Sequence, residues 1–158
     1  MEASIAADTE VAEFAGQLFF RLWRASHERT AMALESLDMT PAQFGVLNLL
    51  AARDGAIQQE IGAAMGIDPS TMVSLIDELE RKGLAKRRPH PSDRRAREVS
   101  ITPKGRRLLG RGKKMALEVE NELLRGLTAA ERRQLLKLLR RALSEAPPQT
   151  LWSSAEGD

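Results

Sequence analysis

The sequence predicts a mainly α-helical protein that carries one small β-hairpin. Leu, Ala, Arg and Glu dominate its 158 residues and aromatic residues make up 4%, a composition that favours helix over strand. Apolar residues recur at helical spacing through most of the chain. Between residues 84 and 101 the pattern changes to two short stretches around a proline-rich turn, as in a hairpin.

The first two helices are predicted at residues 9–37 and from Thr40 to just before Gly55. The apolar stripe of the first helix is wider than one core face requires, which indicates burial on two sides, for example in a dimer. The second helix begins with a capping box, in which Thr40 and Gln43 each bond the other's backbone N–H, and Pro41 suits the first helical position.

A helix-turn-helix candidate follows. A short helix at about residues 58–65 ends at Gly66, and the pair Asp68 and Pro69 starts another helix that Gly83 ends. Two helices joined by so short a turn are typical of the helix-turn-helix motif.

The hairpin comes next, with strands at residues 84–88 and 98–101 and a turn at residues 89–93. Helix, turn, helix and basic hairpin stand here in the order of a winged helix. Two further helices, at about residues 103–125 and 128–145, each begin at a capping threonine.

Positive charge is concentrated in residues 81–114. This window holds fourteen of the 24 Lys and Arg residues and only two acidic residues, a net charge of +12. The rest of the chain holds ten basic and twenty acidic residues. Such a distribution is typical of a polyanion site, with DNA as the leading candidate, although a solvated charged face gives the same pattern.

Composition excludes several classes of site. The chain has no cysteine, which excludes disulfides, thiolate metal ligands and thiol-based redox sensing. Its two histidines, His27 and His90, are far apart and do not by themselves make a metal site. With neither a nucleophile–base pair nor a Gly-rich phosphate loop, we expect no enzyme and no cofactor. No apolar run is long enough to span a membrane and residues 1–13 are no secretory signal, so a cytoplasmic protein is expected.

Three stretches of the chain resemble the MarR family of bacterial transcription regulators. Residues 68–84, DPSTMVSLIDELERKGL, resemble its recognition helix, and residues 90–105, HPSDRRAREVSITPKG, resemble its wing. Residues 40–47, TPAQFGVL, match the family upstream, and the resemblance covers roughly residues 10–145. The wing signature of the family falls on Asp93, Arg95, Val99, Ile101 and Thr102.

The resemblance implies a homodimer that binds a pseudopalindromic operator in double-stranded DNA. Residues 9–37 and 103–145 would form a helical dimerisation region, and residues 38–102 the winged helix-turn-helix lobe. Many members of the family release DNA when a small aromatic or phenolic compound binds. Residues 1–8 are expected to be a disordered N-terminus and residues 146–158 a flexible tail.

In the predicted recognition helix, Ser70, Thr71 and Ser74 are the expected DNA contacts, because short hydroxyl side chains near a helix N-terminus can meet base edges or phosphates. Helix-start propensity alone also explains Ser70 and Thr71. Met72 is left between contact with a thymine methyl and packing in the core. Three residues are assigned to the core-facing side: Val73, Ile76 and Leu79.

In the predicted wing, Arg94, Arg95 and Arg97 are the expected DNA contacts, because an arginine at a wing tip can enter a narrow minor groove. The family pattern implies that Asp93 orients a neighbouring arginine. Which of Arg94 and Arg95 enters the groove stays open, and a solvated basic loop is the alternative. Contacts with phosphate are expected from four further residues: Gln58, Gln59, Arg87 and Lys104.

A ligand pocket is expected around Trp23, Arg24 and His27. Trp23 and His27 share a helical face, and an aromatic wall beside an imidazole and a guanidinium would suit a small aromatic carboxylate. The alternative is a dimer-core tryptophan with polar surface neighbours. Phe44 and Met115 are pocket candidates by family position only.

The predicted function is sequence-specific regulation of transcription, as a repressor, by a ligand-responsive homodimer. The alternative is a winged-helix protein that coats DNA without reading its sequence, or that contacts other proteins.

Overall fold

The computed structural model describes residues 14–53, 55–90, 92–93 and 96–145. The described residues form six helices and a three-stranded sheet, which confirms the predicted class. The elements in chain order are α1 (Ala15–Glu35), α2 (Pro41–Ala52), β1 (Ala56–Ile57), α3 (Gln58–Met65), α4 (Pro69–Arg81), β2 (Ala85–Pro89), β3 (Arg97–Ile101), α5 (Pro103–Leu123) and α6 (Ala129–Glu145). The predicted disordered start at residues 1–8 and the predicted tail at residues 146–158 lie outside the described residues.

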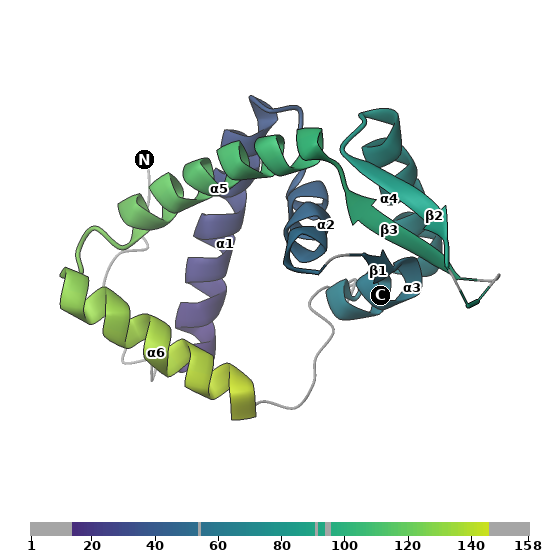
Figure 1. Cartoon of the computed structure of the whole chain (residues 1–158). Helices are drawn as coiled ribbons and strands as arrows, with labels where there is room; N and C mark the ends of the chain where they lie inside the picture. The colour runs from purple at the N-terminus through teal and green to yellow at the C-terminus, as the bar shows by residue number, and fades with distance from the viewer. Residues whose placement is uncertain (1–13, 54, 91, 94–95, 146–158) are drawn as a thin grey trace, which may run out of the picture.

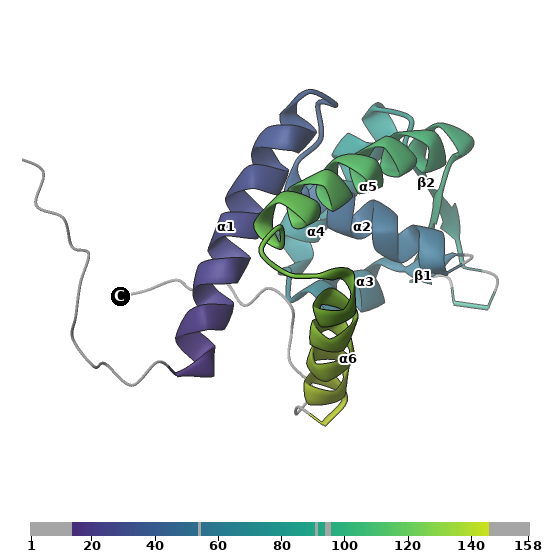
Figure 2. The ribbon, with the colours of Figure 1, turned by 90° about the vertical axis from the view of Figure 1, so that its left-hand side faces the viewer.

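The chain divides into a lobe and a set of long helices that extend from it. Helices α2, α3 and α4 surround the sheet, whereas α1 and α5 lie side by side and lead away from the lobe (Figure 1). Helix α6 turns back from the end of α5 and is separate from the lobe in Figure 1, and it runs down from the end of α5 in Figure 2. None of its residues is buried.

Residues near the helix starts explain where the helices begin. Thr40 Oγ1 accepts a hydrogen bond from Gln43 N, and Gln43 Oε1 accepts one from Thr40 N, both at 3.2 Å. Asp68 caps α4 by accepting from Thr71 N at 2.9 Å, and Thr102 caps α5. Proline follows each of these three caps at the first helical position. The caps therefore lie where the sequence predicts them.

The sheet has the order β1–β3–β2, and both pairs are antiparallel. In the wing hairpin Ala85 lies opposite Ile101, and Pro89 lies opposite Arg97. The prediction missed strand β1, which adds the pair Ala56 and Val99. Two residues are too few to show the alternation by which a strand is detected in sequence.

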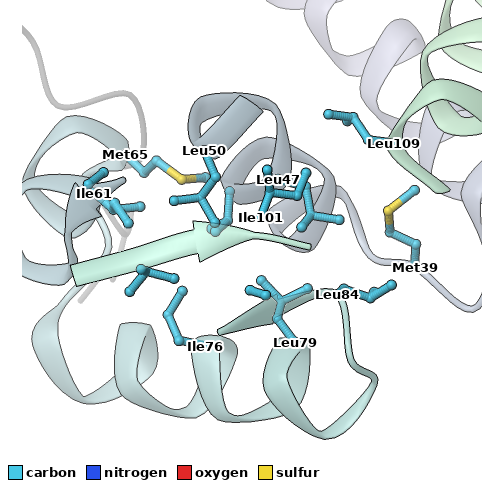
Figure 3. Close-up of a cluster of buried hydrophobic side chains, with 14 of the residues drawn as sticks. Met39, Leu47, Leu50, Ile61, Met65, Ile76, Leu79, Leu84, Ile101 and Leu109 are labelled. Carbon is cyan, nitrogen blue, oxygen red and sulfur yellow. The ribbon is translucent and has the colours of Figure 1, made fainter. Parts of the chain in front are cut away.

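The core fills the space between α2, the sheet and α4. Figure 3 shows β3 passing between α2 on one side and α4 on the other, with side chains from all three meeting around it. Burying one aliphatic side chain stabilises the fold by about 1.5–3 kcal/mol. Because α4 contributes several of the buried side chains, this cluster fixes its orientation on the lobe. Its fully buried members include Leu47, Leu50, Ile61, Met72, Ile76, Leu79, Leu84 and Val99.

Candidate nucleic-acid interface

The N-terminal part of α4 presents three hydroxyl side chains to solvent. Ser70, Thr71 and Ser74 are all exposed, on the side of α4 that faces away from the core. Thr71 follows Ser70 by one residue and Ser74 follows it by four, so the three side chains lie on one side of the helix, beginning at its first turn. The backbone N–H groups of that turn add positive potential. The structure therefore brings the predicted recognition trio together.

The phase of α4 resolves one open alternative and corrects one assignment. Met72 is 1% exposed and belongs to the core, so it is not available to a thymine methyl. Val73, assigned to the core, is 43% exposed. The buried stripe follows Met72, Ile76 and Leu79 at spacings of four and three, and Val73 lies one residue, about 100°, off that stripe. Val73 is therefore an apolar candidate for contact with a thymine methyl that the sequence reading missed.

Asp68 organises the start of this helix. Its Oδ1 accepts hydrogen bonds from Ser70 Oγ at 2.5 Å and from Thr71 N at 2.9 Å. Hydrogen bonds from the Ser70 side chain and then from Thr71 hold the pKa of the Asp68 carboxyl far below its ordinary value. The carboxylate is therefore charged at neutral pH, and it stands at the positive end of the helix dipole.

The wing turn is held by His90, a residue to which the sequence analysis gave no role. His90 Nδ1 accepts backbone N–H bonds from Asp93 at 3.2 Å and from Ser92 at 3.4 Å, and Ala96 N donates to the Asp93 carbonyl at 3.1 Å. A ring nitrogen that accepts N–H bonds carries no hydrogen, so in neutral His90 the proton is on Nε2. Asp93 and Arg97 are exposed on either side of this turn. The two wing arginines of the prediction, Arg94 and Arg95, lie outside the described residues.

Arg87 lies inside the lobe, contrary to its predicted phosphate contact. Its side chain is 19% exposed, and Nη1 lies 2.5 Å from Asp77 Oδ1 and 2.6 Å from Glu80 Oε2. Its Nε donates to Gln58 Oε1 at 2.9 Å, and Nη2 donates to the Val73 carbonyl at 3.1 Å. Successive side chains of a strand point to opposite faces of the sheet. Position 87 therefore points toward α4, whereas the exposed positions 86 and 88 point to the other face. The side chain therefore joins β2, α3 and α4.

The other predicted phosphate contacts fall in different surroundings. Gln58 is engaged with Arg87, whereas Gln59 is exposed at the start of α3. Lys104 Nζ donates to the Lys82 carbonyl at 2.7 Å and so binds the C-terminal end of α4, the end opposite Ser70. That position does not support its predicted phosphate contact.

Part of the basic window therefore lies away from the hydroxyl face of α4. On α5, Lys104, Arg107 and Arg111 surround Leu108 in an open depression of about 320 Å³. This depression lies beside the C-terminal end of α4, because Lys104 contacts Lys82 there.

The predicted ligand residues fall into two separate groups. Trp23 and His27 stack with ring centroids 5.1 Å apart, and Arg24 Nε lies 2.9 Å from a carboxylate oxygen of Glu28 on the exposed side of α1. Met115 packs at the other end of α1, where Ser36 Oγ lies 3.9 Å from its sulfur.

These two groups do not form one pocket within a single chain. Trp23 and Ser36 are about 20 Å apart along the helix axis. Phe44 belongs to the second group, since a Cβ at Gly112 on the α5 turn before Met115 would lie 3.0 Å from its ring.

The described residues contain no group of three metal-ligating side chains. No helix among them is long and apolar enough to cross a membrane. The features that the structure does combine are a helix-turn-helix with an exposed hydroxyl face and a two-stranded wing with exposed basic residues. Together they define a winged helix-turn-helix protein.

Comparison with known proteins identifies the family. A model of the MarR family matches residues 37–96. The proposed transcriptional regulatory protein for the hcr operon of Thauera aromatica is 32% identical over 144 residues, which are 85% of this chain and 87% of that protein. The chain belongs to the MarR family of transcriptional regulators, whose members are not enzymes.

Solved structures show the same fold. The transcriptional repressor CouR, solved on a 23-mer DNA duplex, is 35% identical with a TM-score of 0.77, and the match covers 89% of this chain and 99% of CouR. BpsR of Bordetella bronchiseptica, whose DNA binding is regulated by 6-hydroxynicotinic acid, is 28% identical with a TM-score of 0.73. That match covers 89% of this chain and 100% of BpsR.

The internal position of Arg87 can be tested by substitution. We expect Arg87→Met to lower the free energy of unfolding by about 1–3 kcal/mol, because charged hydrogen bonds to the α4 carboxylates are lost. The slope of log DNA affinity against log salt should stay unchanged, since no phosphate contact is removed. Urea unfolding and a salt titration measure the two quantities. Arg88→Met, an exposed neighbour on β2, is the control and should not change stability. If Arg87→Met kept full stability but reduced the salt slope by about one, the predicted contact of Arg87 with a phosphate would be right.

Proposed function

We propose that the protein is a sequence-specific repressor that acts as a homodimer on a pseudopalindromic operator. The observation that carries this proposal is the exposed hydroxyl face at the start of α4, beside a wing, in a fold shared with a repressor solved on DNA. In such proteins the second helix of the motif enters the major groove, and a dimer places two of these helices about one turn of DNA apart. Ser70, Thr71, Val73 and Ser74 are the side chains that would meet base edges.

The wing would supply the second contact with DNA. Arg94 and Arg95 follow Asp93, and the wing hairpin ends in exposed Arg97. A guanidinium at this position suits a narrow minor groove, where the negative potential is strongest. Asp93 would orient the arginine that enters. Major-groove contact by α4 and minor-groove contact by the wing would then occur on the same half-site.

The homodimer is supported by apolar surface on the helices outside the lobe. On α1, Phe19 is 51% exposed, Phe20 is 59% exposed and Trp23 is 53% exposed. On α6, Leu138 is 43% exposed, Leu143 is 72% exposed, and no residue is buried. Isolated helices of this length are marginal in water, so α6 needs a partner surface. A second copy of α1 and α6, in the dimerisation region at residues 9–37 and 103–145, supplies such a surface by symmetry.

A small aromatic or phenolic anion is the proposed effector class. The stacked pair Trp23 and His27 offers an aromatic surface with a ring nitrogen. Arg24, the next residue after Trp23 in the sequence, carries a guanidinium. An effector bound among the dimerisation helices would shift the population of lobe spacings away from the one that fits DNA. The regulation of BpsR by 6-hydroxynicotinic acid, an aromatic acid, supports this class.

Fluorescence anisotropy distinguishes this function from coating of DNA or contacts with proteins alone. At roughly physiological salt we expect the purified protein to bind the DNA upstream of its own gene at least about a thousandfold more tightly than a scrambled duplex. The same complex, challenged with hydroxylated benzoic acids, should release DNA if the effector class is right. Equal weak binding to both duplexes would contradict an operator in this DNA and favour coating.

The wing contact predicts the effect of a double substitution. Arg94→Ala with Arg95→Ala should weaken operator binding at least tenfold, because the minor-groove guanidinium and a neighbouring cation are both lost. The mass of the dimer and its unfolding free energy should not change. Arg125→Ala, an exposed arginine just beyond α5, serves as the control for a loss of positive charge. Unchanged affinity in the double variant would exclude the wing as a DNA contact.

The dimer predicts the effect of charge on α6. Leu138→Asp with Leu143→Asp should reduce the mass measured by light scattering from two chains to one, because carboxylates would be buried without partners. Operator affinity should fall with the dimer, since a single lobe contacts one half-site. Ser144→Asp, at an exposed polar position on the opposite side of the same helix, should leave the dimer intact. A double variant that keeps the mass of two chains would place the interface elsewhere.

A further inference from the structure

The hydroxyl hydrogens of two serines on the exposed face of α4 are already used within the protein. Ser70 Oγ lies 2.5 Å from Asp68 Oδ1, and Ser74 Oγ lies 3.3 Å from the Ser70 carbonyl oxygen. A carboxylate and a carbonyl have no hydrogen to give, so each serine must be the donor in its bond. A serine hydroxyl has one hydrogen and two lone pairs. Both side chains therefore face solvent as hydrogen-bond acceptors.

The bond from Ser70 is the stronger of the two. Its acceptor is charged, since the pKa of Asp68 is held far below its ordinary value by the Ser70 and Thr71 side chains. Hydrogen bonds to a charged acceptor are shorter and roughly twice as strong as those between neutral groups. Asp68 is itself fixed by the bond from Thr71 N at 2.9 Å, so the direction of the Ser70 hydrogen is set by the cap of the helix.

An acceptor at this position discriminates among the groups that DNA offers. Phosphate oxygens are acceptors and cannot bond to it. In the major groove guanine O6 and N7 and thymine O4 are also acceptors. The donors there are the amino groups at adenine N6 and cytosine N4. The charge of Asp68 directly behind Ser70 adds to this preference, because it attracts a donor and repels an acceptor.

We propose that Asp68 and Ser70 form a reader of exocyclic amino groups, in which Ser70 Oγ accepts from adenine N6 or cytosine N4 while donating to Asp68. This inference rests on the proposed function, and it names the determinant of specificity within the recognition helix. Ser70 thereby specifies a base instead of contacting a phosphate, which is the other use of a hydroxyl at a helix start.

The test begins with selection of binding sites from random DNA duplexes by four forms of the full-length protein: wild type, Ser70→Ala, Asp68→Gly and Ser36→Ala. Wild type should fix the base pair at one position in each half-site, where the amino group of that pair, at adenine N6 or cytosine N4, is the candidate contact. Ser70→Ala should reduce that preference by about three- to tenfold, as expected for one lost hydrogen bond. Ser36→Ala is the matched control, because the Ser36 hydroxyl also donates to a protein oxygen and is exposed, but lies at the end of α1.

Asp68→Gly tests the role of the carboxylate separately from the role of the hydroxyl. Glycine is tolerated at a helix N-cap with little loss of stability, and circular dichroism checks that the helix remains. With the carboxylate removed, the Ser70 hydrogen is free to reach thymine O4 or guanine O6. The fixed position should therefore broaden to other base pairs while the rest of the site is retained.

Base analogues then locate the contact. In the selected operator, purine in place of adenine or 2-pyrimidinone in place of cytosine removes only the amino group. Wild type should lose about three- to tenfold in affinity, and Ser70→Ala should lose nothing further, since the two changes remove the same bond.

The outcomes separate this inference from the proposed function. If wild type selects a defined site and Ser70→Ala selects the same site with equal stringency, the amino reader is wrong while the repressor function stands. If wild type selects no site at all, both fail. Unchanged affinity of wild type for operators that lack the amino group at each fixed position would also overturn the reader, because no amino contact would then be made.

Discussion

The geometry of the DNA-binding lobe depends on one guanidinium. Arg87 extends from the wing strand β2 to Asp77 and Glu80 on α4 and to Gln58 on α3, and the backbone N–H of Arg87 donates to Glu80 at 2.7 Å. Only arginine offers five donors in a planar fork, so a single side chain can bond all three partners at once. Strand β2 of the wing is therefore bonded directly to α4 and α3 in the folded lobe.

The same contact also solves an electrostatic problem. Helix α4 carries acidic residues within two turns of its exposed hydroxyl face, and uncompensated carboxylates there would repel phosphates. Arg87 balances Asp77 and Glu80, while Lys82 lies 3.8 Å from Glu78 and 3.1 Å from Asp38. At least two of the fourteen cations in the basic window are thus used to neutralise acids within the protein. The surface charge that attracts DNA is smaller than the sequence count, and it is divided between the wing and α5.

The sequence was a good guide wherever a feature depends on neighbouring residues. The capping box of Thr40 and Gln43 and the Asp68 cap lie within three residues of their partners, and local pattern was enough to find them. Features that join distant segments were missed, as with strand β1 and the bond from Arg87 to Gln58, 29 residues away. The phase of α4 was misread because Met72 and Val73 are both apolar and adjacent. Only the packed position of the helix shows which of them faces the core.

The far end of the recognition helix is tied to the helices proposed to form the dimer. Lys82 Nζ donates to the Asp38 carbonyl at 2.5 Å, and Asp38 adopts a left-handed backbone conformation with φ of 50° in the turn after α1. Aspartate tolerates this conformation better than most residues, so the turn is tight and its carbonyl faces α4. The C-terminal end of α4 is therefore bonded directly to the turn that follows α1. In a homodimer built on α1, the separation of the two recognition helices is set by the same helices that would bind an effector. A ligand there needs no contact with the lobe to change its fit to DNA.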